Sequence, residues 1–318
     1  MNLVLALVLS LEVPFIAQKP NYCGPAALAM IASFYGHNVT QDEIASAIYL
    51  PEIRGTLTPD LADYAQRFNL WTRQYGGTRA DLHQKLAAGI PMIVLGRLGN
   101  HYHYFVVLDY RGGELIVHSD TRANLRLSED DFLRWWNRAD RWTLLVCPPD
   151  RATWRLSADE QNDLGVFLER RGELAAAAGH YQLATELEPR NAYFQLNLGN
   201  ALLKQHLSTE AAAAYGHALE IDPNNADAMN NLAFALVELG ANLDQAEQLC
   251  HRAVSLRPSH RAYYLDTLGS VFLKQGRGRE AIAAYEQALA ATTERQAGLR
   301  AAIKQRLDTA RSGSGVDN

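Results

Sequence analysis

The stretch Gln18-Lys-Pro-Asn-Tyr-Cys-Gly-Pro-Ala places Cys23 directly before a Gly-Pro pair and a run of small helix-forming residues. Proline is well tolerated in the first turn of a helix, so we expect a helix to begin at this cysteine. The amides and positive dipole end of that helix would face the sulfur, which favours a thiolate. Gln18 brings a side-chain amide that can stabilise an oxyanion. The stretch therefore predicts a nucleophilic cysteine with an oxyanion donor beside it, although a lone cysteine is also commonly a buried core residue.

A cysteine nucleophile needs a base from another part of the chain. The stretch Asn100-His-Tyr-His-Tyr-Phe-Val-Val offers His101 and His103 at the start of an apolar strand. Residues two apart in a strand share a face, so either imidazole can point toward the cysteine. Asp120 ends the following strand, where a group that orients an imidazole would be expected.

Composition is that of an ordinary globular protein, with 48% hydrophobic and 20% charged residues. A length of 318 residues is enough for about two domains. The net charge of -5, with basic residues scattered along the chain, excludes a general nucleic-acid binder. The three cysteines are an odd number at wide spacing, which predicts neither a disulfide framework nor a metal site.

Residues 1–11 form an apolar run with no basic residue before it. A secretory signal also needs a basic start and a small-residue cleavage site, and eleven residues are too few to span a bilayer. We interpret the run first as the remnant of an export signal, and otherwise as a short peripheral anchor or an edge strand. An export signal would place the protein in the periplasm or outside the cell, and otherwise the cytoplasm is expected. Membrane association is expected only through this run.

Residues 12–149 mix helix and strand signals. A helix is expected to follow Cys23, and another to begin at Thr40, where Thr40 and Glu43 have the spacing of a capping box. Further helices are expected over 59–68 and 79–88. Strands are predicted by runs rich in valine, isoleucine and aromatic residues, at 91–95, 104–108, 114–118 and 142–146. Helices first and an antiparallel sheet afterwards is an α+β order.

A repeat begins at about residue 158. A Leu-Gly or Leu-Ala pair recurs about every 34 residues, followed by an alanine, an aromatic residue, a second alanine and a proline. This period and pattern resemble the tetratricopeptide repeat. We expect four copies over 158–293, a capping helix over 294–311 and a polar tail over 312–318. Cys250 holds the position of a tyrosine in the other copies and is predicted to be core, as is Cys147 at the end of a strand.

Three segments of the first half carry a second resemblance. Val13-Pro-Phe-Ile-Ala-Gln18, Tyr22-Cys-Gly-Pro-Ala-Ala-Leu28 and His103-Tyr-Phe-Val-Val107 together resemble the papain-like cysteine peptidases related to the bacteriocin-leader-processing family. The resemblance spans residues 12–149.

The resemblance implies a role for each matching residue. Gln18 corresponds to the oxyanion glutamine, Cys23 to the nucleophile, His103 to the base and Asp120 to the orienting aspartate. Asp120 is followed by threonine, where the processing family usually has proline, so Asn124 is the alternative orienting group. His101 is the alternative base.

The activity implied is hydrolysis of a peptide bond through a thioester, with no metal, nucleotide or other cofactor. The processing relatives cut after a double glycine and are usually fused to a transporter, whose nucleotide motif this sequence lacks. The repeats offer a concave surface for an extended peptide or a protein partner. We therefore expect a peptidase whose repeats recruit a protein substrate or partner. The alternatives are a catalytically inactive adaptor that acts through its repeats, and a transferase or amidase that uses the same Cys-His pair.

Overall fold

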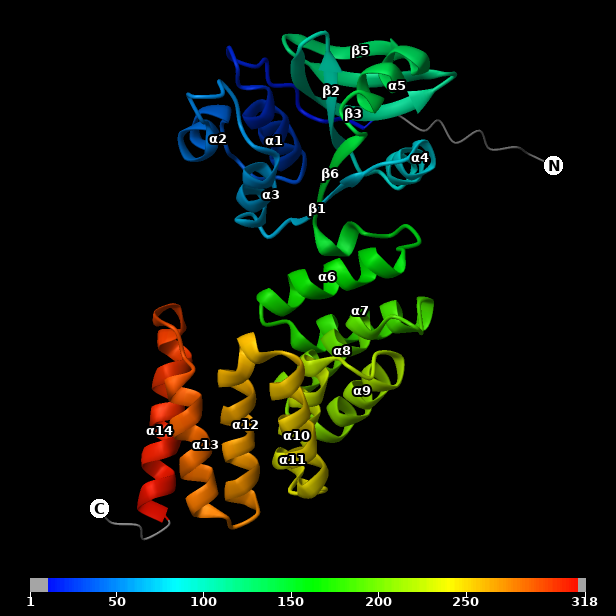
Figure 1. Cartoon of the computed structure of the whole chain (residues 1–318). Helices are drawn as coiled ribbons and strands as arrows, with labels where there is room; N and C mark the ends of the chain where they lie inside the picture. Colours follow the sequence, from blue (N-terminus) through cyan, green and yellow to red (C-terminus); the bar gives the residue numbers. More distant parts are fainter. Residues whose placement is uncertain (1–10, 314–318) are drawn as a thin grey trace, which may run out of the picture. The chain divides into compact units, whose positions relative to one another are not determined.

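The structure is a computed structural model that describes residues 11–313. Contacts divide the chain into two compact units, Met1–Leu156 and Ser157–Asn318 (Figure 1). Residues 1–10 of the predicted leader and 314–318 of the predicted tail lie outside the described residues. None of the helices within residues 11–313 combines the length and the hydropathy that crossing a bilayer requires.

The first unit is an α+β domain built on one antiparallel sheet. Its strands are β1 (Trp71–Gly76), β2 (Met92–Leu98), β3 (His101–Arg111), β4 (Glu114–Ser119), β5 (Arg122–Ser128) and β6 (Trp142–Cys147). Its helices are α1 (Cys23–Phe34), α2 (Gln41–Ile48), α3 (Thr58–Gln66), α4 (Arg79–Ala87) and α5 (Glu129–Asn137), with a 3₁₀ turn over Pro149–Arg151. The strand order across the sheet is β1-β6-β2-β3-β4-β5, which puts β3 at an inner position.

The two faces of β3 pack against different helices. Tyr104 and Val106 join α1 and α3 in one buried core, together with residues of β2 and β6. Phe105, which points to the opposite face because side chains alternate along a strand, stacks on Trp135 of α5 with the ring centroids 6.1 Å apart. A strand that is buried on both faces holds its backbone firmly, and this is the strand that carries His103.

The order of elements differs in two ways from the predicted helices followed by sheet. Strand β1 precedes α4, and α5 lies between β5 and β6. Strands β1 and β5 were not expected from the sequence, because their apolar patterns are weak. Each buries one side chain, Trp71 in β1 and Leu127 in the edge strand β5. Helix α5 buries only Phe132 and Trp136, which are four residues apart on one face.

The second unit is a run of helices that matches the expected solenoid. They are α6 (Ala158–Arg170), α7 (Leu174–Leu187), α8 (Ala192–Lys204), α9 (Ser208–Ile221), α10 (Ala226–Leu239), α11 (Leu243–Leu256), α12 (Arg261–Lys274), α13 (Gly278–Ala290) and α14 (Ala297–Gly313), with 3₁₀ turns over Pro258–His260 and Glu294–Gln296. Consecutive helices from α6 to α13 pack as pairs, and α14 packs on α13. Within the described residues, helix α14 reaches Gly313, two residues beyond the expected bound of 311.

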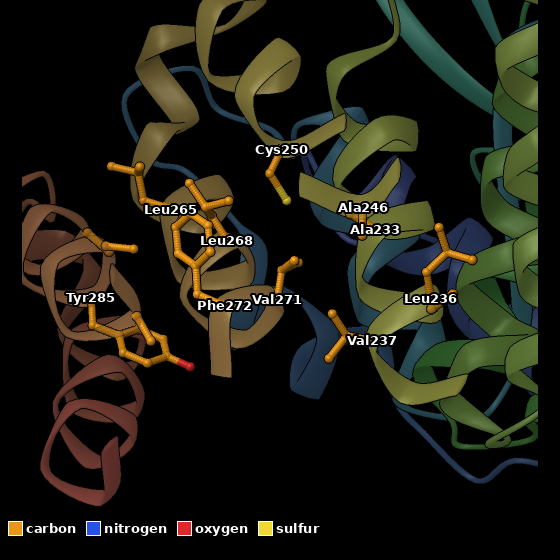
Figure 2. Close-up of a cluster of buried hydrophobic side chains, with 14 of the residues drawn as sticks. Ala233, Leu236, Val237, Ala246, Cys250, Leu265, Leu268, Val271, Phe272 and Tyr285 are labelled. Atoms are coloured by element: carbon orange, nitrogen blue, oxygen red, sulfur yellow. The ribbon is translucent and has the colours of Figure 1, made fainter. Parts of the chain in front are cut away.

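The repeat pattern is explained by one packing contact. A Cβ placed on Gly199 would lie 2.5 Å from the ring of Tyr215, and Gly165 and Gly269 have the same relation to Tyr181 and Tyr285. The third copy has Ala233 and Cys250 at these two positions, and both are buried in the same cluster (Figure 2). A larger residue on one helix is thus matched by a smaller residue on its partner, which confirms Cys250 as core.

Gly199→Ala should therefore lower the free energy of unfolding by about 1–3 kcal/mol, because the added methyl group overpacks the contact with Tyr215. Gly216→Ala is the matched control. Nothing lies within 4 Å of its added Cβ, and replacing glycine inside α9 should stabilise the protein by about 0.5–1 kcal/mol. Urea unfolding measures both changes. In a Tyr215→Cys background the cost of Gly199→Ala should shrink, and an undiminished cost would contradict this explanation.

Candidate active site

A tight turn joins the predicted oxyanion donor to the predicted nucleophile. The backbone N–H of Tyr22 donates to the carbonyl of Lys19 at 3.0 Å, and Asn21 adopts a left-handed conformation with φ +65°. Asparagine tolerates this region better than most residues. Gln18 lies directly before the turn and Cys23 directly after it, as the first residue of α1. Within the described residues, the side-chain amide of Gln18 forms no hydrogen bond, so it is available to a ligand.

The Cys23 sulfur is half-buried and faces backbone amides. No described side chain caps the start of α1, and the N–H groups of Gly24 and of Cys23 itself approach the sulfur. The N–H of Tyr104 in β3 approaches it from the other side. Glycine is required next to the nucleophile, because a Cβ on Gly24 would overlap Oγ1 of Thr56. The sulfur therefore sits between the start of α1 and the strand that bears the histidine.

His103 is buried on β3 and is held by the end of β4. Its Nε2 lies 3.1 Å from Oγ of Ser119 and 3.7 Å from Oδ1 of Asp120. Its ring meets Phe105 edge-on, with the centroids 4.8 Å apart. Nδ1 makes no hydrogen bond to another described residue, which leaves it as the ring nitrogen for a thiol proton. His101, by contrast, is exposed where β3 begins.

Asp120 connects the base to the oxyanion donor. Its carbonyl accepts a hydrogen bond from the backbone N–H of Gln18 at 3.0 Å, while its carboxylate is the group near His103. The carboxylate is 44% exposed and also acts electrostatically on Cys23. Asn124, the alternative orienting residue, donates its backbone N–H to Nδ1 of His118 at 3.1 Å.

Burial sets the protonation of the Cys23–His103 pair. It raises the pKa of the Cys23 thiol above its ordinary value; the amides of Tyr104, Gly24 and Cys23 oppose the rise, and the charge of Asp120 adds to it. Burial also lowers the pKa of His103, against the raising effect of Asp120. Burial of both groups therefore favours a neutral thiol and a neutral imidazole. This direction is opposite to the thiolate expected from the helix start, because the desolvation of the sulfur outweighs the amides that face it.

The neutral resting state can be measured by the ultraviolet absorbance of a thiolate. A raised pKa keeps the thiol protonated until the pH exceeds its ordinary value of 9.0. Subtracting the spectrum of Cys23→Ala, which retains the two buried cysteines, should leave no thiolate signal at pH 7 and a rising signal only above pH 9. A signal already present near pH 6 would show an ion pair and contradict this assignment.

Two side chains at the site carried little signal in the sequence. The Ser119 hydroxyl is the closest polar partner of His103, although a serine at a strand end is unremarkable by itself. The side chain of Gln41 forms hydrogen bonds to the backbone of Ala17 and Lys19, on either side of Gln18. Because Ala17 lies 24 residues away in an irregular segment, no local sequence pattern indicates this contact. Within residues 11–313, no group of three or more His, Cys, Asp and Glu side chains is arranged to hold a metal ion.

Comparisons with known protein families match three segments of the chain. The Peptidase C39 family matches residues 12–149, and tetratricopeptide repeat families match residues 192–225 and 224–294. A search of curated protein sequences finds no match.

Several solved structures each match part of this chain. The peptidase domain of Streptococcus ComA, a bifunctional ABC transporter of a quorum-sensing pathway, is 22% identical over 43% of this chain and 99% of its own, with a TM-score of 0.39. MamA is 23% identical over 48% of this chain and 85% of its own, with a TM-score of 0.41. A thermophilic tetratricopeptide repeat protein of Thermus thermophilus is 23% identical over 50% of this chain and 84% of its own, with a TM-score of 0.43. From the family matches and the fold, this chain carries a Peptidase C39 domain at residues 12–149, followed by C-terminal tetratricopeptide repeats.

Proposed function

We propose that residues 12–149 form a cysteine peptidase in which Cys23 is the nucleophile and His103 the base and acid. One observation carries the proposal. The segments that carry the three residues meet: the N–H of Tyr104, next to His103 on β3, approaches the Cys23 sulfur, Ser119 holds His103, and the N–H of Gln18 donates to Asp120. A buried imidazole held at Nε2, on the strand whose next N–H approaches a half-buried thiol, is an arrangement suited to nucleophilic catalysis.

The attack step follows from the neutral pair. Nδ1 of His103 takes the thiol proton as Cys23 Sγ bonds to the peptide carbonyl carbon. The carbonyl oxygen becomes an oxyanion, which accepts hydrogen bonds from the Gln18 side-chain amide and the Cys23 backbone N–H. Ser119 and Asp120 hold the other ring nitrogen, and the carboxylate stabilises the imidazolium that forms.

Breakdown of this intermediate returns each group to its starting state. The His103 imidazolium donates its proton to the leaving amine, the C–N bond breaks, and the acyl group remains on Cys23 as a thioester. Water then attacks the thioester, giving its proton to His103. The carboxylic acid leaves and the sulfur recovers its proton, so the cycle needs no group beyond water.

The repeats are a protein-interaction region, and we assign them the recruitment of a protein substrate or partner. Helices α10, α12, α13 and α14 line a pocket of about 500 Å³, large enough to take side chains of a docked segment. Its lining mixes apolar and polar groups, among them Leu273, Lys274 and Gln305.

A survey of protein N-termini in cells tests the function. The native protein is compared with Cys23→Ser, which should retain the fold because the replacement is nearly isosteric and Cys23 is only partly buried. New N-termini that occur only with the native protein would support the peptidase and give its substrate and cleavage motif together. Identical sets of termini, with the same partners captured by both proteins, would instead favour an adaptor that acts through its repeats.

A further inference from the structure

The segment that carries Gln18 has neither helix nor strand to hold it. Residues 11–19 are irregular, so their backbone groups must find partners in other elements. Three anchors supply them. Nε2 of His118 lies 3.0 Å from the carbonyl of Val13, the N–H of Gln18 donates to Asp120, and Gln41 contacts the residues on both sides of Gln18.

Gln41 uses both ends of its side-chain amide on this segment. Its Nε2 donates to the carbonyl of Ala17 at 2.9 Å, and its Oε1 accepts from the N–H of Lys19 at 2.9 Å. Gln41 is only 8% exposed, although it is the first residue of α2. A buried amide is tolerated when both of its ends are hydrogen-bonded, and here both are.

These contacts fix the backbone dihedral angles of Gln18. The peptide group before Gln18 is held at both of its polar atoms, because Ala17 O accepts from Gln41 and Gln18 N donates to Asp120. The peptide group after Gln18 is held through Lys19 N, again by Gln41. With both peptide planes held, φ and ψ of Gln18 are set, and so is the direction in which its side chain leaves the backbone.

The start of α2 is itself well fixed. Thr40 and Glu43 form a reciprocal capping box, with the Thr40 N–H donating to the Glu43 carboxylate at 2.8 Å and the Glu43 N–H to the Thr40 hydroxyl at 3.2 Å. Ile44 anchors the helix in the core shared with α1. The ion pair of Lys19 with Asp42 is exposed and contributes little. Gln41 therefore attaches the irregular segment around Gln18 to the well-fixed start of α2.

We propose that Gln41 is a positioning residue of the oxyanion hole, which preorganises the Gln18 side-chain amide by fixing the backbone on both sides of it. The inference rests on the proposed peptidase function, because it concerns a group that acts on the oxyanion. Gln41 itself touches neither the substrate nor the reacting atoms. Its effect on catalysis must pass through Gln18, and this sets the test.

The test is a double-mutant cycle on the full-length protein, with a peptide found in the N-terminal survey as substrate. Gln41→Ala should lower kcat by about 10–100-fold, the scale for a displaced catalytic group, and leave KM within about twofold. Gln18→Ala should lower kcat by about 10²–10³-fold. In the Gln18→Ala background, Gln41→Ala should have no further effect.

Two controls separate positioning from general stability. Gln66→Ala removes a glutamine hydrogen bond to Thr72 in the same domain and should leave kcat unchanged. Alkylation of Cys23 by iodoacetamide forms no oxyanion, so its rate should be equal in Gln41→Ala and the native protein.

The outcomes are distinct for the two claims. A native protein that cleaves no peptide would overturn the proposed function and this inference with it. A native protein that cleaves would leave the function standing, while the inference would be overturned by a Gln41→Ala variant of equal kcat, or by a fall in kcat that persists in the Gln18→Ala background.

Discussion

Replacing Cys23 with alanine should lower kcat for peptide hydrolysis by on the order of 10⁶-fold, the scale for removing the nucleophile of a catalytic unit. No other described thiol can take over, because Cys147 and Cys250 are buried in strand and repeat cores. The fold should be retained, because the cysteine is half-buried and alanine begins a helix equally well. Initial rates with a peptide from the N-terminal survey measure the effect.

The matched controls are the other two cysteines. Cys147→Ala and Cys250→Ala remove buried sulfurs far along the chain, so they should lower thermal stability and leave kcat of the folded protein within a few-fold. Turnover by Cys23→Ala above a hundredth of the native rate would exclude this cysteine as the nucleophile.

His103→Ala should lower kcat/KM by about 10²–10⁴-fold, the usual contribution of general acid–base catalysis. The neutral thiol makes the histidine necessary, because burial raises the pKa of Cys23 and little thiolate exists without a base. His101→Ala is the control, since His101 lies two residues earlier on the same strand and is exposed. Its kcat/KM should remain within a few-fold of the native value. A larger loss of kcat/KM in His101→Ala than in His103→Ala would identify His101 as the base.

The pH profile identifies the base independently of any structural effect. Burial lowers the pKa of His103, so the imidazole remains a base until the pH falls below its ordinary value of 6.5, and kcat/KM should decline only below that pH. The charge of Asp120 raises the pKa of His103, so Asp120→Asn should shift the decline to still lower pH. A shift toward higher pH would show that this charge does not act on the base.

Much of the fold could be read from the sequence, because apolar periodicity reports what is buried. The strand around His103 is buried on both faces and was predicted from its valines and aromatic residues. The repeats were predicted because a Gly–Tyr contact recurs in three of the four copies. In the third copy Ala233 and Cys250 take these positions, where a larger residue on one helix faces a smaller residue on the other. Strands β1 and β5 escaped prediction, because each buries a single side chain and the edge strand β5 is otherwise solvent-exposed.

The candidate site was predictable in its residue types and less so in its electrostatics. Gln18, Cys23 and His103 stand out by type and by their place at element ends, and the structure brings their segments together. The protonation of Cys23 depends on how much of the sulfur is buried, which spacing along the chain does not report. Ser119 and Gln41 act through contacts between elements distant in sequence, so neither has a local pattern.

The central claim is that Cys23 carries the acyl group during turnover. Mixing the native protein with excess peptide, quenching in acid within milliseconds and measuring intact and digested masses tests this directly. We predict an added mass equal to the N-terminal product less water, located on the peptide that contains Cys23 and absent in Cys23→Ala. Turnover without any adduct on this peptide, or with the adduct on the peptide of another residue, would contradict it.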